Sequence, residues 1–176
     1  GADLGGWLGR LTACVLAMGA ALLLSIPAAA AAQAVAQVPF DPAAAAFINT
    51  IGTAHVSGQA FVRQTNGKLL RAVGTDVFLI PRTAYSDLRM SALYGSGKRL
   101  KWGTHLPPED PRYKAYVRKT VASSSGSFSF DHVADGAYYV VAMIFGPGEF
   151  VSYQFPIMER VSVRRGQSVR VVMRGY

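Results

Sequence analysis

Short runs of alternating nonpolar and polar residues fill the sequence from Ala54 onward, and this pattern constrains the fold more than any other feature. In residues 54–63 the nonpolar side chains fall at every second position, which puts them on one face of a strand. The pair Asn66-Gly67 follows and is typical of a tight turn, because both residues take positive φ at low cost. Comparable runs recur at 75–81, 113–122, 126–130, 137–145, 151–155, 161–163 and 168–174. Seven or eight short strands with Gly-rich turns predict an all-β sandwich.

Residues 137–145, AYYVVAMIF, are nonpolar at nearly every position rather than at every second one. A strand of this kind is expected in the centre of a sheet that is covered on both faces. The segment 84–111 lacks the alternation, and one short helix is predicted within it over 86–95. Ser86 is the predicted N-cap, Asp87 lies in the first turn, and Gly95 follows the end.

The N-terminal 36 residues have the pattern of a secretory signal peptide. Arg10 precedes the uncharged nonpolar run 11–26, and an alanine-rich stretch then offers cleavage after Ala32 or Ala36. Residues 37–52 are predicted to be a linker with one helical turn at Pro42–Ile48, and residues 53–176 to be the sandwich domain. This organisation predicts an exported protein, periplasmic or extracellular; the alternative is an uncleaved N-terminal segment that anchors the chain in a membrane.

Charge and cysteine content narrow the classes of function. The one cysteine, Cys14, lies in the predicted signal peptide, so the exported chain would have no disulfide, thiol nucleophile or cysteine-bound zinc. The net charge is +8. An exported basic protein meets anionic polymers and lipid headgroups, so we expect these as partners and expect no nucleic acid.

The segment DHVADG (131–136) places Asp131, His132 and Asp135 close together between two strongly patterned strands. Three such side chains raise the question of a metal or catalytic site. Asp and Gly are also what a chain reversal requires, and the alternating acidic pattern of a calcium loop is absent. We therefore interpret the segment as the turn of a β-hairpin and predict no catalytic residue, metal or cofactor.

The string G-x-F-x-F-x-x-V-x-x-G-x-Y-x-V-x-A over 126–142 resembles the signature of carboxypeptidase regulatory-like domains, which are transthyretin-like Greek-key sandwiches. Residues 56–86 resemble the first half of the same pattern, so the likeness covers about 53–174. It implies a seven- to eight-stranded, transthyretin-like β-sandwich without catalysis. It also implies an accessory or scaffold role beside a protein partner in the cell envelope.

Relative to the pattern of that family, residues 84–111 are an inserted loop. This loop supplies a candidate binding site of four residues, namely Lys98, Arg99, Lys101 and Trp102. Cations around an exposed ring suit anionic glycans or lipid headgroups. The alternative interpretation is a solvated loop whose Trp102 packs onto the sandwich. A second basic cluster surrounds the predicted last hairpin and consists of Arg160, Arg164, Arg165, Arg170 and Arg174. Exposed charges of this kind deter edge-to-edge aggregation, and they are also compatible with a binding face.

Enzymatic motifs are absent from the sequence. It has no H-E-x-x-H zinc motif, phosphate loop or G-x-S-x-G elbow. A transthyretin-like hydrolase, hydroxyisourate hydrolase, is the remaining enzymatic alternative, because residues 54–56 and 173–176 faintly echo its ends. Its His-x-His strand and its terminal Tyr-Arg-Gly-Ser are missing. The three histidines, His55, His105 and His132, lie in separate segments.

Overall fold

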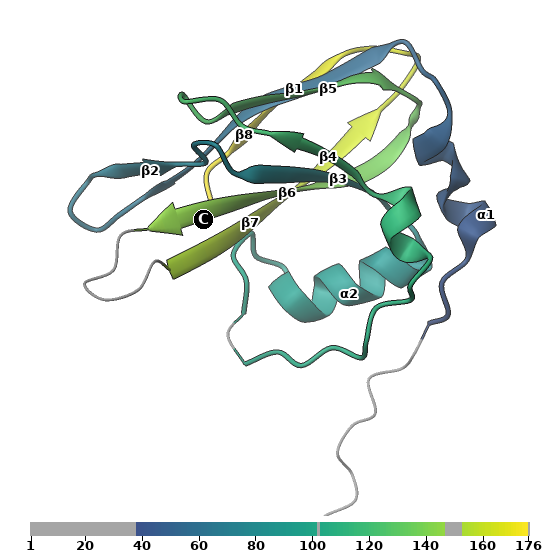
Figure 1. Ribbon diagram of the computed structural model, residues 1–176, viewed down its shortest axis with the longest axis horizontal. Helices are drawn as coiled ribbons and strands as arrows, with labels where there is room; N and C mark the ends of the chain where they lie inside the picture. Colours follow the sequence, from purple (N-terminus) through teal and green to yellow (C-terminus); the bar gives the residue numbers. More distant parts are fainter. Residues whose placement is uncertain (1–37, 102, 147–152, 176) are drawn as a thin grey trace, which may run out of the picture. The chain divides into compact units, whose positions relative to one another are not determined.

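The computed structural model describes residues 38–101, 103–146 and 153–175, which form eight strands in two sheets (Figure 1). Sheet 1 contains β1 (Ala54–Arg63), β2 (Leu69–Arg71), β5 (Ser127–Val133) and β8 (Val169–Met173). Sheet 2 contains β3 (Asp76–Pro81), β4 (Arg118–Val121), β6 (Gly136–Gly146) and β7 (Tyr153–Val163). The predicted all-β sandwich with one short helix in an inserted loop is confirmed.

Strand β1 organises sheet 1. It pairs with β5 in the antiparallel direction on one side and with β8 in the parallel direction on the other. The amide of Ala60 donates to the Gly126 carbonyl, and the Ala60 carbonyl accepts from the Ala72 amide. Because these two groups of Ala60 point to the same side of the strand, β2 continues along the line of β5.

Two strands that follow one another along the chain often fall in different sheets. Residues 161–163 and 168–174 were predicted to pair as the last hairpin. This prediction is wrong, because β7 belongs to sheet 2 whereas β8 crosses to sheet 1. Sheet 2 is antiparallel throughout, in the order β4-β3-β6-β7. Residues 151–155 and 161–163 were predicted as separate strands, but β7 runs unbroken from Tyr153 to Val163. Pro156 is tolerated within it because β7 is an edge strand of sheet 2.

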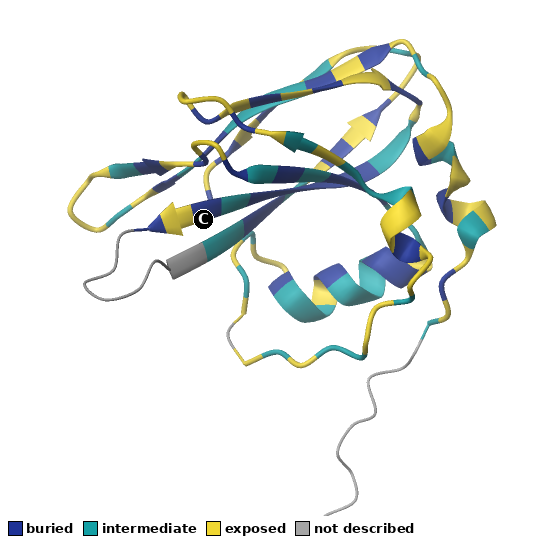
Figure 2. Cartoon of the chain, viewed as in Figure 1, coloured by how far each residue is buried: buried dark blue, intermediate teal, exposed yellow. Residues whose placement is uncertain are grey.

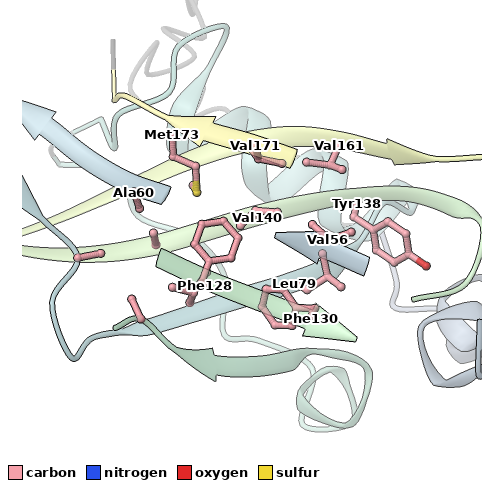
Figure 3. Packing of buried hydrophobic residues seen from close by; sticks show 14 of the residues in the cluster. Val56, Ala60, Leu79, Phe128, Phe130, Tyr138, Val140, Val161, Val171 and Met173 are labelled. Atoms are coloured by element: carbon pink, nitrogen blue, oxygen red, sulfur yellow. The ribbon is translucent and has the colours of Figure 1, made fainter. Parts of the chain in front are cut away.

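The main core lies between the two sheets, where every second side chain points inward (Figure 3). Phe128 and Phe130 of β5 fill it from sheet 1, and Leu79 and Val140 fill it from sheet 2. Gly58 of β1 makes this packing fit. A Cβ at that position would lie 2.7 Å from the Phe128 ring and 2.3 Å from the Val171 carbonyl oxygen.

The other face of sheet 2 is covered by α2 (Ala84–Tyr94) and the 3-10 helix η3 (Tyr113–Tyr116), as Figure 1 shows for α2. A second cluster of buried side chains joins these helices to the sheet: Phe40, Ala45, Ile80, Tyr85, Met90, Tyr94, Tyr113, Tyr139, Val141 and Met158. The hydroxyl of Tyr139 donates to Asp87 of α2 across 2.6 Å. Strand β6 is therefore central and covered on both faces, as its composition predicted.

Local sequence signals predicted the helix correctly but put its first residue too late in the sequence. Helix α2 begins at Ala84 with Thr83 as N-cap, whereas Ser86 was predicted to cap it. Ser86 is instead the third helical residue and completes a capping box with Thr83, while its hydroxyl donates to the Pro81 carbonyl across 2.7 Å. Residues 113–116 form η3, so the strand predicted from residue 113 begins only at Arg118.

The segment before β1 contains α1 (Pro42–Ala45) and the 3-10 helix η2 (Ala46–Asn49), which confirms the predicted helical turn. Although the sequence suggested a linker here, Phe40, Ala45 and Ile48 are buried against the sandwich. The predicted signal peptide lies outside the described residues. Among the described residues, no helix is long and nonpolar enough to cross a membrane.

Candidate functional site

The outer face of sheet 1 is the sheet surface left open in the described part of the chain. Sheet 2 is covered on both faces, whereas exposed and buried residues alternate along β1, β5 and β8 (Figure 2). The outward residues of β5 are Ser127, Ser129 and Asp131. A rigid sheet presenting small polar side chains is a suitable platform for a ligand.

A β-bulge shapes one end of this face. Ala54 pairs with Val133 and Val56 pairs with Phe130, so β5 has one residue more than β1 between these pairs. Asp131 and His132 therefore both lie opposite His55. His132 has φ 55°, a left-handed conformation that costs a residue with a Cβ about 1–2 kcal/mol. Strain of this kind is concentrated at functional sites.

The bulge brings four polar side chains together. His55 Nδ1 lies 2.8 Å from Asp131 Oδ1, and the hydroxyl of Ser129 donates to the same oxygen across 3.3 Å. The ring centroids of His55 and His132 are 6.5 Å apart. All four side chains belong to exposed residues, so they remain available to a ligand.

An open groove of about 500 Å³ adjoins the bulge. Its walls come from β5, from β4, and from the end of η2 with the two residues that follow it. The lining residues are Ile48, Asn49, Thr50, Ile51, Arg118, Lys119, Thr120, Ser129, Phe130, Asp131 and His132. Most of them carry hydrogen-bonding groups, and both donors and acceptors are represented. Ile51, which is 85% exposed, adds a nonpolar side chain.

Charge in the groove is held in place by short contacts. Arg118 donates to the backbone carbonyl of Asp131 across 2.6 Å, and its guanidinium carbon lies 5.9 Å from the centre of the Phe130 ring. The hydrogen bond with His55, and then that from Ser129, lower the pKa of Asp131. The Asp131 carboxylate is therefore ionised at neutral pH and accepts hydrogen bonds.

This pKa shift predicts an acid-sensitive contribution to stability. Because the folded-state pKa is lowered, Asp131 stabilises the fold above its unfolded-state pKa of about 4, and the contribution is lost as pH falls through the folded-state value. We expect Asp131→Asn to narrow the difference between urea midpoints at pH 6 and pH 3. An unchanged difference would show that the contact with His55 contributes nothing to folding.

The segment 131–136 is only partly the turn that the sequence predicted. Asp131 and His132 belong to β5, and the reversal consists of Ala134 and Asp135. It links sheet 1 to sheet 2 and is not a hairpin between paired strands. Asp135 turns away from the bulge and accepts hydrogen bonds from the amides of Arg165 and Gly166, at 2.7 and 2.8 Å. Asp131, His132 and Asp135 therefore do not converge on one point. No group of three or more metal-ligating side chains occurs among the described residues.

The predicted loop site is only partly described. Trp102 lies outside the described residues. Lys98 forms an ion pair of 2.6 Å with Glu159 of β7, and Arg99 donates to the Gly175 carbonyl. A Cβ on Gly95 would lie 2.6 Å from Lys101 Nζ, so the Lys101 side chain runs back over the end of α2. These contacts attach Lys98 and Arg99 to the sandwich, which is a structural role for both.

Sequence reasoning treated the histidines as separate and did not find the bulge. The local pattern of 126–133 does carry a sign of the extra residue, because strict alternation from Phe128 and Phe130 would turn His132 inward and Val133 outward, whereas Val133 is buried and His132 is exposed. The bulge arises from the pairing of β5 with β1, which is a tertiary contact. A second signal was His55, the one histidine of β1 and an outward residue of that strand.

The fold and the groove define a class: an all-β sandwich of two sheets, one buried on both faces and one open to solvent. No protein-family model matches the sequence, and no curated protein matches it. A solved structure from Pseudomonas aeruginosa, which carries the name "putative carbohydrate binding protein", is similar to the chain with a TM-score of 0.63. The two are 21% identical over 78% of this chain and 99% of that one, a likeness that shows the shared fold.

Proposed function

We propose that this protein is a non-catalytic carbohydrate-binding module and that the groove beside the β5 bulge binds the sugar. The observation that carries the proposal is the bulge itself. It holds His132 in a strained conformation and turns Asp131 toward His55 at the open end of a rigid sheet. A feature that costs stability and gathers exposed polar groups is better explained by a ligand than by folding.

The chemistry of the groove suits a sugar. Each sugar hydroxyl both donates and accepts a hydrogen bond, so its site needs the two kinds of group side by side. Asp131 is an ionised acceptor, whereas Arg118 and Lys119 are donors with no acceptor atom. Ile51 offers the nonpolar surface that the C–H face of a sugar ring can cover. The volume lies within the range of about 300–1,000 Å³ usual for small-ligand sites.

The comparison with solved structures also supports carbohydrate binding. The Pseudomonas aeruginosa structure is named for carbohydrate binding and shares this sandwich. A shared fold does not by itself carry a function to this chain, so the proposal depends on the groove. The scaffold role implied by the family resemblance stays a prediction, since no feature of the described residues points to a protein partner.

The same residues argue for binding without catalysis. In a hydrolytic triad the histidine lies between the serine and the acid, so that it can accept the serine proton. Here Asp131 lies between Ser129 and His55, and one carboxylate oxygen contacts both. Ser129 therefore does not donate to a histidine as the serine of such a triad does. We further propose that the protein is exported, through residues 1–36, and belongs with carboxypeptidase regulatory-like domains.

Binding of oligosaccharides to the purified protein tests the proposal. We expect at least one sugar on a panel of neutral and acidic oligosaccharides to bind. Asp131→Asn should lower the affinity for that sugar about tenfold, because a charged hydrogen-bond acceptor is lost. Ser91→Ala, an exposed site on α2, is the matched control and should bind normally. Absence of any bound sugar, or equal affinity in Asp131→Asn, would reject the groove as the site.

The variant His132→Gly tests whether the strained conformation of His132 serves sugar binding rather than stability. Glycine adopts φ 55° without cost, so the variant relieves about 1–2 kcal/mol of strain, and about 0.5–1 kcal/mol of unfolded-state entropy opposes this gain. We expect a higher free energy of unfolding in urea together with weaker sugar binding. A variant that binds sugar as tightly as the native chain would show that His132 is not a contact.

A further inference from the structure

We infer that the open face of sheet 1 continues the groove into a binding surface for a linear acidic polysaccharide. This inference rests on the proposed function and names the class of glycan. Outward positions along β1 run from His55 to Arg63, which is about 26 Å at the usual rise per residue of a strand. Such a length exceeds one sugar ring, so the face can contact several residues of a chain.

The registers place the residues of this face in rows across the strands. Ser129, Ser57 and Arg170 form one row, in which Ser57 of β1 is the central residue. The next row contains Ser127, Gln59 and Val172. Further along β1, Phe61 pairs with Arg71 and Arg63 pairs with Leu69 of β2. The face thus begins at the groove with Asp131 and ends at β2.

Positive charge predominates on this face. Arg63, Arg71 and Arg170 are exposed, and none of the three takes part in an ion pair within the described residues. Asp131 is the one acidic residue among the outward positions of these strands, and His55 contacts it. The other acidic side chains of the described residues belong to sheet 2, to the helices and to connecting segments, at Asp41, Asp76, Asp87, Glu109, Asp110, Asp135 and Glu159.

Unpaired arginines on an open sheet fit carboxylates at intervals along a polymer, because a guanidinium binds a carboxylate through two parallel hydrogen bonds. Between the arginines the small side chains of Ser57 and Ser127 allow a chain to lie close to the sheet. Phe61 is half-buried and offers the edge of a ring to a sugar face. The face therefore combines charged and nonpolar contacts at separate points along its length.

The same surface fits other anionic polymers less well. A membrane-binding surface needs nonpolar side chains that enter the lipid, and on this face Val172 is 46% exposed while Phe61 and Leu69 are half-buried. Single-stranded nucleic acid needs several neighbouring aromatic rings on which successive bases stack, whereas here Phe61 lies six residues along β1 from His55, and His132 lies opposite His55.

The affinity of the protein for acidic polysaccharides, compared with a neutral polymer and a short acidic ligand, tests the inference. The probes are polygalacturonate and hyaluronate, with fully methyl-esterified polygalacturonate as the neutral counterpart and trigalacturonate as the short ligand. At 0.1 M NaCl we expect at least one acidic polymer to bind more tightly than the trimer and the ester. Arg170→Glu should weaken polymer binding about tenfold, because it places a like charge against the ligand. Lys114→Glu, the same charge change on η3, should leave it unchanged.

The outcomes separate this inference from the proposed function. If sugars bind through Asp131 but neither acidic polymer binds more tightly than trigalacturonate and the methyl ester, the extended face is rejected and the groove stands. If Arg170→Glu leaves polymer affinity intact, the face is likewise rejected. If phosphatidylglycerol vesicles or single-stranded DNA bind through Arg170 while the polysaccharides do not, the face recognises another anion. If no sugar of any kind binds, both proposals are rejected.

Discussion

Gly58→Ala is expected to lower the free energy of unfolding by about 3 kcal/mol or more, one of the two largest effects that we predict. The added Cβ would lie 2.3 Å from the Val171 carbonyl oxygen, which is backbone, and 2.7 Å from the Phe128 ring. Overpacking a filled core costs about 1–3 kcal/mol where side chains can move. Here β8 itself would have to shift, so the cost should be at the top of that range or above it. Urea denaturation followed by circular dichroism measures it.

The matched control is the next residue of the same strand. Ser57 points to the open face, and Ser57→Ala should change stability by less than about 0.5 kcal/mol. If Gly58→Ala and Ser57→Ala unfold at the same urea concentration, β1 does not face the core as described, and the assignment of its outward residues to a binding surface is also wrong.

Phe40→Ala is expected to cost about 3–5 kcal/mol, the usual range for removing a buried phenylalanine side chain. The Phe40 ring makes edge contacts with Tyr85, Tyr113 and Tyr116, at centroid separations of 5.3–5.5 Å. Its loss would leave a cavity between the segment before β1, α2 and η3, where these three tyrosines now contact it. Thermal unfolding of the two proteins under the same buffer conditions provides the measurement.

Ile51→Ala is the control for this segment. Ile51 lies between η2 and β1 and is 85% exposed, so its truncation should leave stability unchanged within about 0.5 kcal/mol. Equal stability of Phe40→Ala and the native protein would mean that the segment before β1 is a linker after all. The sequence suggested a linker because two prolines and an alanine tract resemble one, and only packing distinguishes the two cases.

The strands were predictable wherever one face is buried, because alternation then follows directly from the sheet. Residues 54–63 are of this kind, whereas 75–81 and 137–145 are nonpolar runs covered on both faces, and each of the three became a strand within one or two residues of the expected limits. The pairing of strands was not predictable in the same way. The parallel contact of β8 with β1 joins segments more than a hundred residues apart, and no local pattern encodes it.

The candidate site shows the same division. The polar character of Asp131 and His132 was visible in the sequence, and their interpretation as a turn followed from Asp and Gly nearby. The break in alternation at 132–133 indicates an extra residue in β5, but only the pairing of β5 with β1 shows that Asp131 and His132 lie opposite His55. The loop residues Lys98 and Arg99 stood out through local charge, yet both have partners on the sandwich that are distant in sequence.

One sheet is enclosed on both sides and the other on only one, and this asymmetry has a consequence for variation among descendants of this protein. Outward residues of β1, β5 and β8 can be exchanged with little thermodynamic penalty, whereas almost every position of β6 is constrained by neighbours above and below. Selection can therefore retune recognition on the exposed surface while the enclosed layer preserves the scaffold. We expect ligand preference in such a lineage to diverge much faster than architecture.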